Sequence, residues 1–472
     1  MPIDQHGLEL TGSAEAVEHY DRAIHELLHF REGVIDEARS AYQADPTFPM
    51  GNALRAYLRL LSSEPDDAAA AREPFERFRA SVPADRLLPR ERGHVDAVAA
   101  WLDGDMRGAG QILAEVTRTH PRDALALAVA HQIDFFTGDA LMLRDRIGSA
   151  LPAWSEQDDP HYGPMLGMYA FGLEEQGEYD RSEDTGLHAV DLDGKDVWGI
   201  HAVVHTYEMQ ARFAEGIRYY DARRDDWSKG NFFTVHNWWH YCLYRLEAGD
   251  VGRALEIYDA AIHNADSAGA ALEMLDAGAL LWRLYLDGID QPERWSALAD
   301  AWAARNDPPF YSFNDAHAVM SYVGAGRFAT AEELIADRER YVAEPHPGVT
   351  NHAMTARVGL PVCKAIVAFG KSRYGQAVDL LYPIRTYVNE FGGSHAQRDA
   401  VQRTLLEAAI RAERYELAGS LLDERIHVKP CSPYNWLKQA RLAEALGDRA
   451  AASAAEQRAQ ELVGASGVTP GS

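Results

Sequence analysis

Apolar residues recur along the chain with the three-to-four-residue spacing of amphipathic helices, whereas the alternation typical of strands is short and rare. A recurring phrase separates the apolar segments: a small or acidic turn, then a helix with a small residue near its start. The clear copies centre on Gly104, Gly138, Gly177, Gly249 and Gly326, and weaker ones lie at Phe213, Ser372, Glu413 and Gly447. The first four glycines are 34, 39 and 72 residues apart, and 72 is two units of 36.

Units of this length are typical of tetratricopeptide-like helix hairpins. One hairpin cannot bury its apolar stripe alone, so neighbouring hairpins must stack into a continuous core with a concave face. We therefore predict an all-α fold, an α-solenoid of degenerate TPR-like hairpins curled around a central groove. It should span residues 13–463 as one domain, with an N-terminal tail over 1–12 and a disordered C-terminal tail over 464–472.

Charge and cysteine content indicate which classes of partner and which cellular compartment to expect. The net charge of −26 over 472 residues repels phosphate backbones, so no nucleic-acid partner is expected. The three cysteines, Cys242, Cys363 and Cys431, match neither a zinc motif nor a disulfide framework, which fits a reducing cytoplasm. We find neither a signal peptide nor a run of about 18 uncharged apolar residues, so we expect a cytoplasmic protein without a membrane span.

Two pairs of histidines stand out on neighbouring helices of the predicted repeat. His201 and His205 are four residues apart in a phrase that continues to Glu208, and His236 and His240 have the same spacing around two tryptophans. At about 100° per residue, each pair shares one stripe of its helix, and Glu208 lies within about 20° of His201. Two such stripes facing each other would bring four imidazoles and a carboxylate together.

Three roles remain open for this cluster. The histidines brace packed helices, hold a divalent metal, or bind and protonate a small acid. Imidazole and carboxylate ligands suit Zn²⁺, Fe²⁺, Ni²⁺ and Mn²⁺ alike. Because position 202 is Ala, the His-Glu-x-x-His arrangement with its built-in general base is absent. A hydrolytic centre would need another carboxylate, and the candidates are Glu208, Asp276 and Asp315.

Further polar residues are expected at one level of successive inner helices. Four histidines precede the turns of their hairpins by seven to nine residues, so we expect them to face one groove: His131, His205, His240 and His317. The expected substrate-binding residues are His131, Trp238, Trp239, Asn314, His317 and Arg398, and Asp315 is expected to be catalytic. A helix cap for Asp315 and a salt bridge for Arg398 are the structural alternatives.

Several longer phrases resemble the tetratricopeptide repeat protein 38 family. They are 44–50, 131–136, 167–173, 201–209, 236–240, 313–317, 359–363 and 392–399, in the same order over nearly the whole chain. The resemblance implies an all-helical repeat fold and an intracellular protein, and it brings motifs without a settled activity. His395 departs from the family pattern, in which we expect Asn, so a direct catalytic role is not expected there.

Two functions from different classes follow. The main hypothesis is an enzyme that encloses a small organic substrate in the groove, with His201, His205, Glu208, His236 and His240 as a metal-dependent, hydrolytic centre. The alternative is a non-catalytic interaction scaffold whose groove takes a peptide and whose histidines only brace it. A homodimer is compatible with either function.

Overall fold

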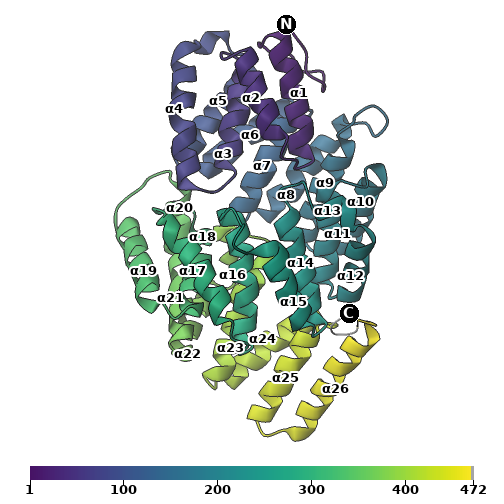
Figure 1. Cartoon of the computed structure of the whole chain (residues 1–472), viewed down its shortest axis with the longest axis vertical. Coiled ribbons are helices and arrows are strands. Elements are labelled where there is room, and N and C mark those ends of the chain that lie inside the picture. Colours follow the sequence, from purple (N-terminus) through teal and green to yellow (C-terminus); the bar gives the residue numbers. More distant parts are fainter. Residues whose placement is uncertain (469–472) are drawn as a thin grey trace.

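The computed structural model describes residues 1–468, which form a helical array (Figure 1). Its first thirteen helices are α1 (Ala14–Leu28), α2 (Val34–Ala44), α3 (Pro49–Leu60), α4 (Pro65–Ser81), α5 (Pro89–Leu102), α6 (Met106–Thr119), α7 (Ala124–Phe136), α8 (Ala140–Ala150), α9 (Tyr162–Glu175), α10 (Tyr179–Leu192), α11 (Val197–Met209), α12 (Phe213–Ala222) and α13 (Arg224–Trp227). The others are α14 (Thr234–Glu247), α15 (Val251–Ile257), α16 (Ala271–Leu286), α17 (Pro292–Arg305), α18 (Ser312–Gly324), α19 (Phe328–Ala343), α20 (Thr350–Met354), α21 (Leu360–Gly370), α22 (Tyr374–Leu381), α23 (His395–Arg411), α24 (Tyr415–Val428), α25 (Pro433–Ala445) and α26 (Arg449–Ala465). No strand forms within residues 1–468, and extended pairing is limited to two single bridges, Ile3 with Glu9 and Arg31 with Asn231.

The recurring glycine phrase marks the turn inside each hairpin. All five clear copies place glycine in the left-handed region, with φ between 67° and 88°, where a side chain would be strained. In three copies the next residue is an aspartate whose carboxylate caps the following helix: Asp105, Asp139 and Asp250. Three of the weaker copies use the same backbone conformation at a non-glycine residue, with φ of 56° to 58° at Ala211, Ser372 and Glu413, and the fourth has Gly447 with φ of 80°. The predicted helix hairpins are therefore confirmed, including the degenerate ones.

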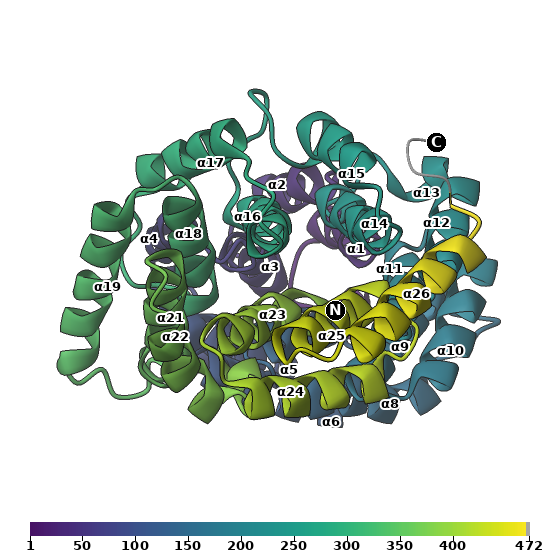
Figure 2. The same cartoon turned by 90° about the horizontal axis from the view of Figure 1, so that it is seen from below.

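The hairpins wind into a curled solenoid, as predicted. Seen from below, second helices of hairpins such as α10, α17 and α19 form the outside, and first helices such as α14, α16, α18 and α23 lie inside (Figure 2). The α7, α9 and α11 helices continue this inner wall toward the N-terminal helices. The first helices are apolar on most sides because they contact helices of the preceding and following units as well as their own partner.

Contacts between distant parts of the sequence close the solenoid. The side-chain amide of Asn314 on α18 donates to the carbonyl of Ser63, 3.2 Å away, just after α3. Phe30, which follows α1, stacks on Phe233 before α14 with ring centres 4.4 Å apart. Near the other end, Lys429 after α24 donates to Glu208 of α11 over 2.9 Å. Segments near both ends of the chain therefore contact the inner helices.

The residues before α1 and after α26 correspond to the two expected tails. Helix α1 begins at Ala14, and the residues before it fold back on the array, with Leu10 fully buried and Asp4 paired to Arg90 at 3.3 Å. Helix α26 ends at Ala465, and residues 469–472 of the predicted C-terminal tail lie outside the described residues. One segment, Thr350–Gly370, is long and apolar enough to cross a membrane, but most of it is buried among other helices.

Candidate functional site

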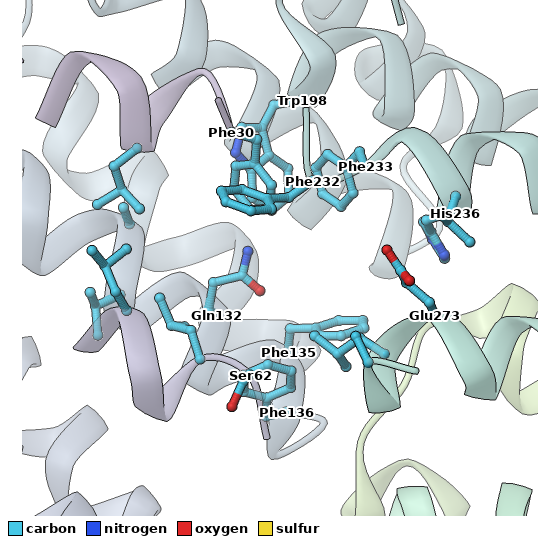
Figure 3. Close-up of a pocket in the computed structure, with 18 of the residues that line it drawn as sticks. Phe30, Ser62, Gln132, Phe135, Phe136, Trp198, Phe232, Phe233, His236 and Glu273 are labelled. Carbon is cyan, nitrogen blue, oxygen red and sulfur yellow. The ribbon is translucent and has the colours of Figure 1, made fainter. Parts of the chain in front are cut away.

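A cavity of about 610 Å³ lies inside the curled solenoid. The first helices α7, α9, α11, α14, α16 and α23 supply one part of its wall, and α1 to α3 with their connections and the start of α4 supply the other. Seven aromatic side chains line it: Phe30, Phe135, Phe136, Phe171, Trp198, Phe232 and Phe233. Figure 3 shows these rings, apart from Phe171, around the open space, with Gln132, Ser62, His236 and Glu273 as polar groups among them. Its size and apolar lining are those of a small-molecule site.

The two predicted histidine pairs meet at the wall of this cavity. His201 and His205 lie on α11, and His236 and His240 lie on α14 of the next hairpin. Each ring offers a nitrogen such that the four nitrogens lie within 4.8 Å of one another. His201, His205 and His236 line the cavity, whereas His240 is fully buried behind them. The two stripes therefore face each other, which is the arrangement that the metal hypothesis requires.

A buried carboxylate orients His236. Its Nδ1–H donates to Oδ2 of Asp276 on α16 over 2.7 Å, so Nε2 carries the free lone pair. This Nε2 is 3.2 Å from Nε2 of His240. Two nitrogens that bind one metal ion at about 2.0–2.1 Å in tetrahedral geometry are about 3.3 Å apart. The distance between the two nitrogens is therefore compatible with two ligands of one ion, and it is also that of a hydrogen bond between the two rings.

A second buried carboxylate stands behind His205. Oε2 of Glu174 on α9 lies 3.4 Å from Nδ1 of His205, which leaves Nε2 of that ring for the cluster. Oε1 of the same carboxylate lies 3.8 Å from Nδ1 of His395, a partly exposed residue at the start of α23. Burial alone would raise the pKa of Glu174, but the two imidazoles lower it to about 2. Glu174 is thus an anion next to the cluster.

The electrostatics of the cluster favour neutral rings. Burial, followed by the neighbouring imidazoles, lowers the pKa of His201 and of His240 well below the usual value for histidine. Neutral imidazole is the form that ligates metals. Neither nitrogen of His201 has a hydrogen-bond partner among residues 1–468. Nδ1 of His205 has the 3.4 Å contact with Glu174, whereas Nε2 of His205 and Nδ1 of His240 have no partner among these residues. Buried polar atoms nearly always have a partner. The unpaired imidazole nitrogens are therefore candidates to bind a ligand.

A second group of histidines provides the contrast. Nδ1 of His161 is 2.9 Å from Nε2 of His6, and its Nε2 is 3.0 Å from Nδ1 of His25. Nδ1 of His29 donates to the carbonyl of His25 over 2.7 Å. Nitrogens of His25, His29 and His161 also lie within 4.8 Å of one another. These rings satisfy one another by hydrogen bonds, so this group is explained as a structural imidazole chain.

Glu208, predicted as a fifth metal ligand, does not join the four histidines. Its Oε1 accepts from Nζ of Lys429 over 2.9 Å, and both side chains are largely buried. Helix α11 carries Glu208 one turn beyond His205, where the C-terminal helices close the solenoid, so the carboxylate serves that closure. This corrects the expectation that Glu208 ligates a metal or activates water.

Asp315 and Asn314, expected in a catalytic and a substrate-binding role, lie away from the cavity lining. Oδ1 of Asp315 accepts from Arg338 of α19 over 2.7 Å in a buried ion pair. Asn314 binds Ser63 as described above. Both residues therefore hold α18 against its neighbours and lie apart from the four histidines.

The other expected substrate-binding residues also lie outside the lining. His131 donates through Nε2 to the carbonyl of Met168, and His317 donates through Nδ1 to that of Phe313. Arg398 pairs with Glu175 at 3.0 Å. The expectation that four histidines face one groove therefore fails for His131, His240 and His317. Burial lowers the pKa of His131 to about 3 and that of His317 to about 4.

The two tryptophans between His236 and His240 point to opposite sides of α14. Trp239 is fully buried and stacks on His236, with ring centres 5.3 Å apart and planes at 19°. Trp238 packs on Trp227 of α13, 4.6 Å away, and so belongs to the outer packing of the hairpin. Trp239 is thus a support for His236 rather than a lining residue.

Sequence reasoning missed Glu174 and Glu273 and weighed Asp276 only as a base. Both glutamates lie on first helices, Glu174 near the end of α9 and Glu273 near the start of α16. An acidic residue in an otherwise apolar inner helix is the signal that would have found Glu174, because α9 leaves little polar surface to place it on. Glu273 faces the cavity near His236 (Figure 3).

Comparison with known proteins leaves the family open. No family model matches the chain. Among solved structures, the chain is similar to one in "Crystal structure of APC/C hetero-tetramer Cut9-Hcn1", with 12% identity, 97% coverage of each chain and a TM-score of 0.28. It is also similar to the human IFIT1 dimer with PPP-AAAA (14%, 96% of each chain, 0.37) and to a monomeric IFIT1 mutant with Gppp-AAAA (12%, 96% of each chain, 0.39). At such scores the likeness does not extend to a function.

Proposed function

We propose that this TPR-like protein holds a divalent transition metal at His201, His205, His236 and His240 and binds a small, largely apolar molecule in the cavity beside it. The observation that supports this most is the convergence of four buried or half-buried imidazoles at the cavity wall, each with one nitrogen within 4.8 Å of the others, and with both nitrogens of His201 unpartnered among the described residues. Two buried carboxylates, Asp276 and Glu174, stand behind two of the rings, as they do behind metal-bound histidines.

The donor set fits a borderline metal ion. Imidazole nitrogen suits Zn²⁺, Fe²⁺ and Ni²⁺, and Mn²⁺ accepts it with further oxygen ligands. His201, His205 and His236 border the cavity and His240 lies behind them. Four imidazoles would fill a tetrahedral site, so a position open toward the cavity requires an ion that takes a fifth ligand. A metal in such a position acidifies a bound water and polarises a bound oxygen of the substrate.

For the reaction at this site we propose hydrolysis. Glu273 is the general base in this proposal, instead of Glu208, Asp276 or Asp315, which the sequence analysis considered. Among residues 1–468 this half-buried carboxylate makes no hydrogen bond or ion pair to the protein, and it faces the cavity near His236 (Figure 3). Burial, then the carboxylates of Asp276 and Glu64, raise its pKa. A carboxylate with a raised pKa is suited to take a proton from water at neutral pH. Replacing Glu273 with Gln should abolish turnover while metal binding stays intact.

The proposal also includes a relationship to the tetratricopeptide repeat protein 38 family and a cytoplasmic location. The phrases around the four histidines, 201–209 and 236–240, are two of the eight that resemble the tetratricopeptide repeat protein 38 family, which favours a shared site. The cysteines Cys242, Cys363 and Cys431 are all free, and the first two are buried, which is compatible with a cytoplasmic protein.

A cobalt titration tests the metal proposal. Co²⁺ added to the metal-free protein should give a visible absorption band that saturates at one equivalent. His240→Ala and His205→Gln should each abolish the band, whereas His188→Ala, at an exposed histidine paired with Glu156, should keep it. Unchanged bands in both cluster variants, with native circular dichroism, would exclude the four-histidine centre.

A protein-interaction scaffold is the second candidate, and a surface feature favours it. Terminal repeats of solenoids normally carry a polar outer face. Here three apolar residues at the C-terminal end are more than half exposed: Val428, Leu437 and Leu446. A partner, which a second copy of the chain could provide, would cover them. Leu437→Glu combined with Leu446→Glu should then dissociate that complex, as measured by light scattering, and leave the cobalt band unchanged.

A further inference from the structure

The cavity has two chemically different ends. His201, His205 and His236 lie at one end, with Glu273 and Asp276 of α16. Helices α2 and α3 supply the other, through Ile35, Ala38 and three arginines: Arg39, Arg55 and Arg59. In Figure 3 the N-terminal helices, in purple, lie across the open space from His236 and Glu273. Between the two ends the wall is mainly aromatic. A molecule that fills the cavity therefore meets histidines at one end and guanidinium groups at the other.

One of these arginines lacks an anionic partner. Arg39 pairs with Asp36 at 3.0 Å, and Arg59 pairs with Asp67 at 2.9 Å. The half-buried Arg55 has no carboxylate within salt-bridge distance among residues 1–468, and its guanidinium lies 3.9 Å from the centre of the Tyr42 ring. A ring held against one face of a guanidinium leaves its N–H edge free to bind a planar anion.

The acidic residues of the lining do not neutralise this group. Glu64 pairs with Arg305 at 3.0 Å and also accepts the backbone N–H of Ala271. Asp67 is held by Arg59, and Glu273 lies near His236 and makes no ion pair with Arg55 (Figure 3). Arg55 is therefore the one cavity arginine whose charge neither a carboxylate nor full exposure to water compensates.

We infer that the cavity takes an elongated apolar carboxylic acid, with the carboxylate on Arg55 and the apolar body against the aromatic wall, so that its far end reaches the histidines. This rests on the proposed small-molecule function and names the substrate class for it. A guanidinium and a carboxylate match in shape and form charge-assisted hydrogen bonds. One unpaired arginine matches a single negative charge, and the net charge of −26 disfavours more highly charged ligands.

Matched pairs of ligands separate the headgroup from the apolar body. The full-length protein is titrated by calorimetry with dodecanoate and dodecanol, and with 6-phenylhexanoate and 6-phenylhexanol. The variants are Arg55→Gln and Arg55→Lys, and the control is Arg77→Gln, an arginine on α4 that is 70% exposed and lies outside the cavity. Circular dichroism and melting temperature check that each variant is folded.

The acid of at least one pair should bind more tightly than its alcohol. Arg55→Gln should weaken the acid by about ten- to a hundredfold, the range of a charge-assisted hydrogen bond, and leave the alcohol within about twofold. Arg55→Lys should fall between, and Arg77→Gln should match the wild type. Equal binding of acid and alcohol, or an acid that is insensitive to Arg55→Gln, would overturn the assignment while leaving an apolar cavity site. If neither member of either pair binds, the ligand class is wrong, and the cobalt titration still reports on the metal centre independently.

Discussion

Nδ1 of His236 lies 2.7 Å from Oδ2 of Asp276, a residue one hairpin further along the chain. The other oxygen of Asp276 accepts from the side-chain amide of Gln397 over 3.3 Å, so the carboxylate is held from two sides. This contact turns the Nε2 lone pair of His236 toward His240 and the rest of the cluster. The proposed metal centre thus draws on α9, α11, α14, α16 and α23.

Removing the carboxylates behind the rings should weaken metal binding without removing a ligand. Asp276→Asn and Glu174→Gln should each lower the affinity for Co²⁺ by about 10- to 100-fold, because the rings lose their fixed orientation and some basicity. Competition with a chromophoric chelator measures this. Affinities equal to that of the wild type in both variants would show that the carboxylates serve packing alone.

Glu208→Gln should separate the ligands from their neighbour on the same helix. Because Glu208 pairs with Lys429, this change should leave the cobalt band intact and lower the free energy of unfolding by about 1–3 kcal/mol. Urea denaturation of the metal-free protein measures the second effect. Loss of the band in a folded Glu208→Gln protein would restore Glu208 as a ligand.

The imidazole chain of His6, His161 and His25 should make the fold sensitive to acid. Burial lowers the pKa of His6 to about 4 and that of His161 to about 3, whereas these residues titrate near 6.5 when unfolded. Between pH 6.5 and 4 the unfolded chain therefore binds more protons than the folded one, so stability should fall as the pH is lowered.

His161→Phe should reduce this dependence, since it removes one group that titrates only in the unfolded state. The free energy of unfolding of the metal-free variant should fall less steeply between pH 6.5 and 4 than that of the wild type or of His188→Ala. Identical slopes in all three proteins would show that His161 does not contribute to the acid sensitivity.

Nucleic acid should not bind. The net charge of −26 opposes the counterion release that drives such binding. Fluorescence anisotropy with duplex DNA and with single-stranded RNA should show no change at physiological salt up to micromolar protein. Binding that weakens as salt is added would contradict this expectation.

The hairpin turns and the two histidine stripes could be predicted from the sequence. The Gly–Asp turns predicted the hairpins, because the left-handed conformation and the helix cap are set by neighbouring residues. The spacing of His201 with His205 and of His236 with His240 predicted two stripes, since four residues make about one helical turn. That the stripes face each other followed from the stacking of consecutive hairpins.

The contacts between distant segments that close the solenoid could not be predicted from the sequence. Small rotations at each hairpin add up over the chain, and they decide that Lys429 reaches Glu208 and that Phe30 reaches Phe233. For the same reason the positions of Asp315 and His317 relative to the cavity could not be set by counting from turns. The pairing of side chains one turn apart on a helix was predictable. The contact of His205 with Glu174 in the preceding hairpin and the contacts across the groove were not.

The metal content of the wild-type protein, purified without a histidine tag and without chelators, tests the central claim most directly. Inductively coupled plasma mass spectrometry should find one equivalent of Zn, Fe, Ni or Mn per chain, and His240→Ala and the double change with His205→Ala should both be nearly empty, because ligands of one site act together. A wild-type protein that is metal-free, and stays so after each of these four ions is offered, would contradict the claim.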